Sequence, residues 1–170
     1  YYLGHMIQKY FNNGSKWSVK INYIKEKKPL GTVGSLRLIK KKFDSPFIVM
    51  NCDVMSDINF QELIKYHKTN NSIATVVVKT FNLQNPYGVI RSNGKNFIDF
   101  NEKPITKSNI SAGIYIFNPI VIDLVKQFSI KDIPSLFKKL KEKKMKTIVY
   151  PLYEPWQDVG ISKEYFEKIN

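Results

Sequence analysis

Two aspartates occupy positions where a sheet protein can bind phosphates and metal ions. Asp53 comes shortly after an apolar run at residues 47–50, and Asp158 lies in a turn at residues 156–160. Ligands of open α/β sheets bind beyond the carboxyl ends of the strands, and two carboxylates beside phosphate oxygens suit Mg²⁺. Either aspartate could equally cap a helix or close a turn. Whether they form a magnesium pair depends on whether the fold brings them together.

Two further segments carry groups that could contact a phosphorylated ligand. Residues 29–34 place two glycines, Gly31 and Gly34, just before a predicted helix, so a flat or anionic ligand could approach the backbone N–H groups there. The segment is neither a Walker loop nor a dinucleotide fingerprint. Glu102 and Lys103 offer an acceptor for hydroxyl groups and a cation for phosphate. Glycines before a helix are common, and the segment with Glu102 and Lys103, read alone, also fits a solvated loop.

Apolar periodicity predicts which elements position these groups. Continuous or alternating apolar residues predict strands at 19–23, 47–50, 73–78, 110–117 and 147–150, and a hairpin at 89–91 and 97–100 around Asn93-Gly94. Helical spacing predicts helices at 3–11, 36–39, 60–68, 119–125, 136–140 and 161–169, the third capped by Asp57 or Asn59. Alternating strands and helices predict one α/β domain over residues 1–170, with a mostly parallel sheet and an inserted antiparallel hairpin.

The composition fits a globular protein with anionic partners. The chain has 170 residues, of which 43% are hydrophobic, and a net charge of +13. Only Arg37 and Arg91 are arginines, so groups that read bases are scarce and nucleic acid is not an expected partner. No apolar stretch approaches the ~20 residues of a membrane helix, so no membrane contact is expected. The single cysteine, Cys52, suits a cytoplasmic protein.

Six short motifs occur in a fixed order along the chain. They are Pro-Leu-Gly-Thr-x-Gly at 29–34, Asn-Cys-Asp-Val at 51–54, Tyr-Gly-Val-Ile at 87–90, Glu-Lys-Pro at 102–104, Ala-Gly-Ile-Tyr-Ile-Phe at 112–117 and Trp-x-Asp-Val-Gly at 156–160. As an ordered set over residues 1–165, they resemble the sugar-1-phosphate nucleotidylyltransferase family, which includes mannose-1-phosphate guanylyltransferases and glucose-1-phosphate uridylyl- or thymidylyltransferases. The resemblance implies a Rossmann-like three-layer fold.

The resemblance also implies a reaction and its residues. A sugar 1-phosphate would attack the α-phosphorus of a nucleoside triphosphate, with GTP favoured, to give a nucleotide-sugar and pyrophosphate. The implied catalytic residues are Asp53, Lys103 and Asp158, and the two aspartates would bind Mg²⁺. The implied substrate-binding residues are Gly31 at the nucleobase and ribose, Tyr87, Gly88 and Gly113 at the sugar pocket, and Glu102 on the sugar hydroxyls. Lys103 would bind the phosphate of the sugar.

The chain departs from the family pattern in three places. The family begins with a strand and a G-G-x-G-T-R-L loop, so we expect the chain to be the C-terminal portion of the domain, which leaves the activity of the segment alone open. Ser111 and Ile161 stand where the family commonly has Asn and Thr. The alternative to an enzyme is a catalytically degenerate, regulatory subunit that binds nucleotide-sugar. The one protein partner that we consider, besides the substrates, is a second copy of the chain in a homo-oligomer.

Overall fold

The computed structural model describes residues 3–160 and divides the chain into two compact units. Within the described residues, 3–47 and 118–146 form the first unit, and 48–117 and 147–160 form the second. The helix predicted at 161–169, including Ile161, lies outside the described residues. The prediction of a single domain over the whole chain stays a prediction.

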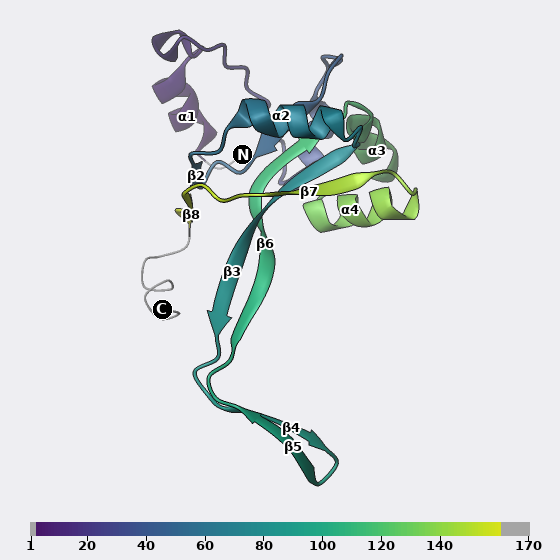
Figure 1. The fold of residues 1–170 in the computed structure, drawn as a ribbon. Helices are drawn as coiled ribbons and strands as arrows, with labels where there is room; N and C mark the ends of the chain where they lie inside the picture. The colour runs from purple at the N-terminus through teal and green to yellow at the C-terminus, as the bar shows by residue number, and fades with distance from the viewer. Residues whose placement is uncertain (1–2, 161–170) are drawn as a thin grey trace. The chain divides into compact units, whose positions relative to one another are not determined.

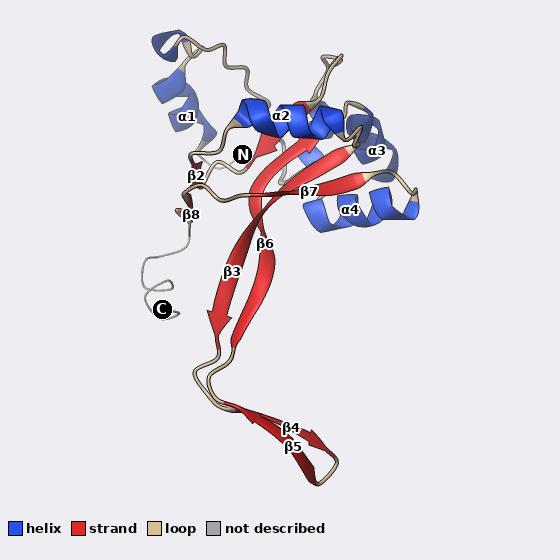
Figure 2. Cartoon of the chain, in the orientation of Figure 1, coloured by secondary structure: helices blue, strands red, loops and turns tan. Residues whose placement is uncertain are grey.

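The second unit is built on a four-stranded sheet (Figures 1 and 2). Its order is β1 (Phe47–Met50), β6 (Ile105–Phe117), β3 (Ala74–Gln84) and β7 (Thr147–Pro151). β3 pairs parallel with β7 and antiparallel with β6. The predicted α/β fold is confirmed, but antiparallel pairing extends beyond the predicted hairpin. The reason is that β3 and β6 flank the hairpin in the chain and pair with each other over residues 74–84 and 105–117, while β4 and β5 form a separate two-stranded sheet.

Two pairs of short strands complete the second unit. β4 (Val89–Asn93) and β5 (Asn96–Asn101) form the predicted hairpin, with Gly94 at φ 58° in its turn. β2 (Val54–Ser56) pairs antiparallel with β8 (Trp156–Asp158). Strands of this length show no periodicity in a sequence, so this second pair could not be predicted from alternation.

Helix α2 (Phe60–Thr69) contributes Leu63 to the buried core of the second unit, and its half-buried Phe60 and Ile64 pack against that core. Asn59 caps it, because its side-chain oxygen accepts hydrogen bonds from the backbone N–H groups of Gln61 and Glu62 at 3.0 and 3.1 Å. Of the two predicted caps, Asn59 is therefore the one used. The buried residues that form this core are Val54, Ile58, Leu63, Val77, Ala112, Ile114, Ile116 and Leu152.

The first unit contains helices and connecting loops. Its elements are α1 (Gly4–Phe11), η1 (Ser15–Trp17), η2 (Gly34–Leu38), α3 (Ile120–Phe128) and α4 (Ile133–Glu142). The four helical predictions at 3–11, 36–39, 119–125 and 136–140 are confirmed, with η2 being a 3-10 helix. No helix within residues 3–160 is both long and apolar enough to cross a membrane.

The strand predicted at residues 19–23 is wrong. The N–H of Val19 donates to the carbonyl of Gly14 at 3.2 Å, and the N–H of Ile21 donates to the carbonyl of Asn13 at 2.9 Å. The Tyr23 hydroxyl donates to the carbonyl of Asn12 at 2.6 Å. The segment thus satisfies polar groups by folding back on the turn after α1. Alternating apolar side chains alone did not reveal this local pairing.

A histidine is buried at the end of α2. His67 is fully buried, and its Nδ1 lies 2.8 Å from the Thr75 hydroxyl and 3.0 Å from the Ser72 hydroxyl. Its Nε2 has no hydrogen-bond partner in the described part of the chain. Burial lowers the pKa of His67 below its ordinary 6.5, and the neighbouring charge of Lys68 lowers it further. The folded protein therefore holds His67 neutral more strongly than the unfolded chain does.

This burial predicts a loss of stability in mild acid. The unfolded chain takes up a proton on His67 as the pH falls through 6.5, whereas the folded chain resists it, so the free energy of unfolding should fall below that pH. Urea unfolding measured at several pH values between about 5 and about 8 checks this. The variant His67→Gln should lose this component of the pH dependence, and the exposed His5→Gln should keep it. The same pH profile in His67→Gln and wild type would contradict the prediction.

Candidate functional site

The structure brings Asp53 and Asp158 together at the β2–β8 pair. Val54 is the register partner of Asp158, and the N–H of Val159 donates to the carbonyl of Asp53 at 2.8 Å. A Cβ atom added to Gly160 would lie 3.1 Å from Oδ1 of Asp158 and 3.2 Å from Oδ2 of Asp53. The two carboxylate oxygens are therefore no further apart than the sum of these distances. Two aspartates distant in the sequence share one small space beside a glycine.

An irregular part of β6 holds both segments that carry these aspartates. The N–H of Asn51 donates to the carbonyl of Gly113 at 2.9 Å, and the indole Nε1 of Trp156 donates to the carbonyl of Ala112 at 2.9 Å. The pairing of β3 with β6 changes register here, so that residues 112–114 face only Val77. Gly113 adopts φ 72°, a left-handed conformation that favours glycine. The neighbouring carbonyls of Ala112 and Gly113 thereby fix the two segments relative to each other.

The pair of carboxylates fits a magnesium ion that also binds phosphate. Within residues 3–160, no three or more His, Cys, Asp or Glu side chains gather in a way that could hold a metal ion. Mg²⁺ commonly takes one or two carboxylates and fills its remaining positions with phosphate and water oxygens at about 2.1 Å. The Gly160 N–H donates to Oδ1 of Asp158 at 2.9 Å and so orients that carboxylate. The donor set thus suits a cation that arrives with a polyphosphate.

Four predicted binding residues, Tyr87, Gly88, Glu102 and Lys103, lie at the base of the β4–β5 hairpin, whereas Gly113, also predicted at the sugar pocket, lies in β6 beside Asn51 and Val54. A Cβ on Gly88 would lie 2.4 Å from the ring of Phe100 and 2.9 Å from Oε2 of Glu102, so Gly88 allows these groups to approach its backbone. Lys103 follows with φ 45° in the turn that leads to β6. Tyr87 is 76% exposed. Gly88 and Glu102 therefore meet, and Tyr87 and Lys103 are their chain neighbours.

The hairpin residues and the aspartate pair are separate groups in this structure. Gly113 follows Ile105, the first residue of β6, by eight positions, and eight residues of extended strand span about 27 Å. Figure 1 shows β4 and β5 beyond the ends of β3 and β6. Over the described range 3–160, no hydrogen bond or ion pair joins Glu102 or Lys103 to either aspartate. Their contact with one shared substrate stays a prediction.

Gly31 lies in the first unit, where its backbone has a structural reason to be glycine. It adopts φ 84°, and an added Cβ would lie 2.3 Å from the carbonyl oxygen of Lys131. That same carbonyl accepts a hydrogen bond from the N–H of Val33 at 3.1 Å. Close approach of two backbone segments thus accounts for the glycine. A contact of Gly31 with a nucleobase stays a prediction.

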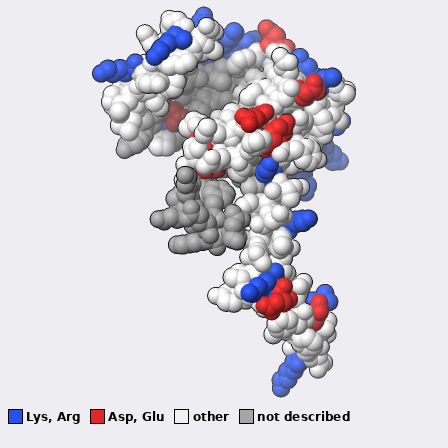
Figure 3. Space-filling model, turned by 60° about the vertical axis from the view of Figure 1, so that its left-hand side comes forward, with Lys and Arg blue, Asp and Glu red and all other residues white. Residues whose placement is uncertain are grey.

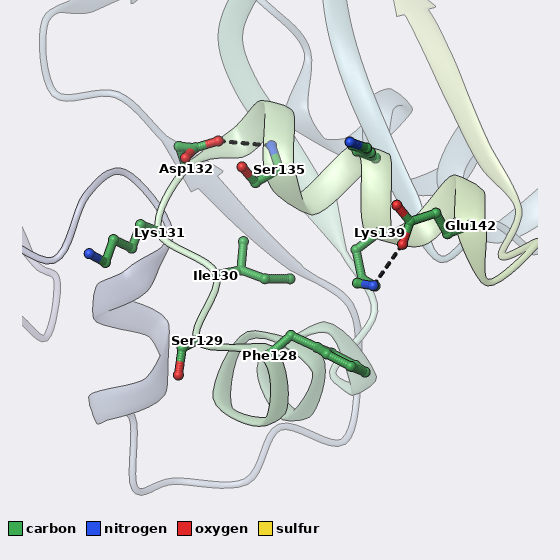
Figure 4. A pocket seen from close by; sticks show the side chains of 9 residues that line it. Phe128, Ser129, Ile130, Lys131, Asp132, Ser135, Lys139 and Glu142 are labelled. Carbon is green, nitrogen blue, oxygen red and sulfur yellow. Dashed lines mark hydrogen bonds and ion pairs between the residues drawn. The ribbon is translucent and has the colours of Figure 1, made fainter.

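A cavity of about 480 Å³ also lies in the first unit, between the end of α3 and α4 (Figure 4). Its acidic side chains already have partners: Asp132 accepts from the backbone N–H of Ser135 at 2.8 Å, and Glu142 pairs with Lys139 at 2.6 Å. These hydrogen bonds lower the pKa of both carboxyl groups. None of the predicted site residues lines this cavity. Capping and pairing of α4 account for its acidic groups.

Sequence reasoning missed the residues that position the aspartates. Ala112, Trp156 and Gly160 were parts of motifs, but their contacts with the aspartate-bearing segments were not predicted. One signal was present in the sequence, because a glycine inside an apolar strand run, Gly113, often marks a bulge or a close backbone approach. The indole contact of Trp156 joins residues 44 positions apart and has no local signature.

The bend at Gly113 yields a prediction on stability. Gly113→Ala should destabilise the protein, because a left-handed Ala costs about 1–2 kcal/mol and its Cβ would lie 3.0 Å from both Asn51 and Val54. Gly94→Ala is the matched control, since Gly94 is also left-handed but has nothing within 4 Å of an added Cβ. Urea unfolding should show a larger loss for Gly113→Ala than for Gly94→Ala. Equal losses would mean that the close approach of Gly113 to Asn51 and Val54 adds nothing to the cost of the substitution in stability.

Comparisons with known proteins show the family of this chain. The family model described as "Nucleotidyl transferase" matches residues 1–170. A mannose-1-phosphate guanyltransferase of Candida albicans is 38% identical over 158 residues, covering 88% of this chain and 43% of the relative. One of Saccharomyces cerevisiae is 37% identical over 158 residues, covering 88% of this chain and 44% of the relative. The chain thus spans less than half the length of these relatives.

Solved structures share the fold. A Bacillus anthracis protein described as a glucose-1-phosphate thymidylyltransferase has a TM-score of 0.70 at 16% identity, over 99% of this chain and 70% of that chain. HddC from Yersinia pseudotuberculosis has a TM-score of 0.67 at 19% identity, over 98% of this chain and 73% of that chain. At such identities the likeness concerns the fold. With the family model matching the whole sequence, the chain belongs to the nucleotidyl transferase family.

Proposed function

We propose that this protein transfers a nucleotidyl group from a nucleoside triphosphate to a sugar 1-phosphate, giving a nucleotide-sugar and pyrophosphate. The observation that carries the proposal is the meeting of Asp53 and Asp158 beside Gly160, within a chain of the nucleotidyl transferase family. For this chain we propose GTP as the donor and a mannose-type sugar phosphate as the acceptor, because its fungal relatives are named mannose-1-phosphate guanyltransferases. Both preferences are part of the proposal.

The reaction needs no covalent bond to the protein. An oxygen of the sugar phosphate forms a bond to the α-phosphorus, the bond from that phosphorus to the β-phosphate oxygen breaks, and pyrophosphate leaves with its electron pair. Catalysis then rests on positioning and on neutralising charge. Asp53 and Asp158 would hold Mg²⁺, which neutralises phosphate charge when bound. Glu102 would accept hydrogen bonds from sugar hydroxyls, and Lys103 would bind the sugar's phosphate.

The net charge of +13 supports a role in attracting polyanionic substrates. On the face drawn in Figure 3, Lys and Arg side chains lie at separate places with acidic side chains between them. Such a distribution raises the local concentration of anions without forming one docking stripe on that face. The charge therefore supports binding of triphosphate and sugar phosphate as a general, salt-dependent attraction.

Release of pyrophosphate tests the proposed function. The chain, with any sequence that naturally flanks it, is assayed with GTP, ATP, UTP and dTTP against several sugar 1-phosphates. We expect Mg²⁺-dependent release, fastest with GTP, and a loss of about 100-fold or more in Asp53→Asn, because removing one metal ligand removes charge stabilisation in the transition state. Asp57→Asn, which changes a nearby aspartate outside the pair, is the matched control.

Three results would argue against the proposal. Wild-type turnover in Asp53→Asn would remove that residue from the metal site. Equal losses in Asp53→Asn and Asp57→Asn would point to a general effect on the fold. Nucleotide-sugar binding without release of pyrophosphate under any substrate pair would instead support the regulatory subunit.

A second prediction concerns the acceptor phosphate. Lys103→Ala should raise the KM for the sugar 1-phosphate about tenfold and leave the KM for the nucleotide little changed, because a charge-assisted hydrogen bond to phosphate is lost. Steady-state kinetics with each substrate varied in turn measure both constants. Lys95→Ala, in the turn of the same hairpin, is the matched control. A rise confined to the nucleotide KM would reverse the assignment of Lys103.

A further inference from the structure

A lysine of the central sheet contacts the segment that carries Asp158. Lys79 lies in β3 and is half-buried, and its Nζ donates hydrogen bonds to the backbone carbonyls of Glu154 at 2.9 Å and Tyr153 at 3.3 Å. These carbonyls belong to the link between β7 and β8. Hydrogen bonds from a charged donor are stronger than neutral ones. Lys79 therefore uses its ammonium group on a peptide segment that lies between two strands.

Other contacts fix the same link, among them a hydrogen bond from the Asp57 N–H to the Pro155 carbonyl at 3.3 Å. At its start, the N–H of Leu152 donates to the carbonyl of Val78 at 2.8 Å, which continues the pairing of β7 with β3. At its end, the Trp156 indole donates to the carbonyl of Ala112 on β6. Between these points the link leaves the four-stranded sheet. Lys79 contacts the link in this intermediate stretch. The nearer of its two partners, Glu154, lies four residues before Asp158.

The ammonium group of Lys79 binds backbone carbonyls and forms none of the ion pairs found in the described part of the chain. The ion pairs found within residues 3–160 join Arg91 to Asp99 and Lys139 to Glu142, and neither involves Lys79. The carboxylate of Glu154, whose backbone carbonyl Lys79 contacts, binds the neighbouring backbone: its Oε2 accepts a hydrogen bond from the N–H of Tyr153 at 3.1 Å. A half-buried ammonium group is desolvated at a cost, and the two carbonyls offset that cost.

We propose that Lys79 is a positioning residue for the metal pair: it holds the β7–β8 link so that the Asp158 carboxylate stays beside Asp53. The metal part of this inference rests on the proposed function. Loss of the ammonium group removes the hydrogen bonds to the carbonyls of Tyr153 and Glu154. β8 then keeps the Trp156 contact and its pairing with β2, which is extended by hydrogen bonds from the Asp57 N–H to the Pro155 carbonyl at 3.3 Å and from the Val159 N–H to the Asp53 carbonyl at 2.8 Å. Lys79 itself touches neither aspartate and acts through the backbone.

Two measurements on the full chain test the inference without turnover. Hydrogen exchange followed by mass spectrometry reports on peptides covering residues 153–160, where the N–H of Val159 is bonded to the carbonyl of Asp53. Binding of Mn²⁺, used as a probe for Mg²⁺, is followed by electron paramagnetic resonance. Lys79→Met keeps the apolar stem and removes the ammonium. Lys107→Met, on the neighbouring strand β6, removes an exposed lysine of the same charge and is the matched control.

We expect Lys79→Met to exchange about tenfold faster in this segment and to bind Mn²⁺ about three- to tenfold more weakly, the size expected from losing a hydrogen bond to a charged group. Lys79→Arg should recover most of both properties, and Lys107→Met should match the wild type. A thermal unfolding curve for each variant confirms that the fold is kept. A purely structural role would lower the melting temperature without a specific change in Mn²⁺ binding.

The outcomes separate this inference from the proposed function. Unchanged exchange in Lys79→Met, or unchanged Mn²⁺ binding while Asp158→Asn loses it, overturns the role of Lys79. Equal effects in Lys79→Met and Lys107→Met also overturn it, because the cause would then be net charge. Wild-type Mn²⁺ binding in both Asp53→Asn and Asp158→Asn contradicts the metal site of the proposed function, and hydrogen exchange then decides whether Lys79 holds the link.

Discussion

Two adjacent backbone carbonyls of β6 are the constraint on which the aspartate site depends. In a regular strand such carbonyls would enter the ladder with the neighbouring strand or face away from each other. Here the change of register opposite Val77 makes the carbonyls of Ala112 and Gly113 available to Trp156 and Asn51. A left-handed residue at 113 makes this turn of the backbone possible. A local defect in the sheet is therefore what organises the site.

The strands that carry the aspartates are too short to hold themselves. An isolated two-stranded pair has marginal stability in water, and β2 and β8 have three residues each. Their stability comes from neighbours of the aspartates: Val54 is buried in the core, and Trp156 packs against it. Each carboxylate thus lies within two residues of an apolar anchor. The polar site and the hydrophobic core are parts of one packing arrangement.

Sequence patterns predicted most elements because those elements are locally encoded. The cap at Asn59, the turn at Gly94 and the apolar faces of the helices follow from residues close together in the chain. The ordered motifs led to the family, which the match over residues 1–170 confirms. The prediction of a strand at 19–23 was wrong because the backbone of this segment forms hydrogen bonds with the turn after α1. The pairing of β2 with β8 was not foreseen, since it joins residues about a hundred positions apart.

The β4–β5 hairpin differs from the rest of the second unit in what its side chains touch. Every residue of both strands is exposed, and none belongs to the core that holds the aspartates. Surface substitutions of this kind usually change stability by less than about 0.5 kcal/mol. The hairpin can therefore accumulate sequence change while the framework around the carboxylates is conserved. On the proposed function, a lineage could acquire new sugar preferences by divergence in this arm alone, with its chemistry inherited intact.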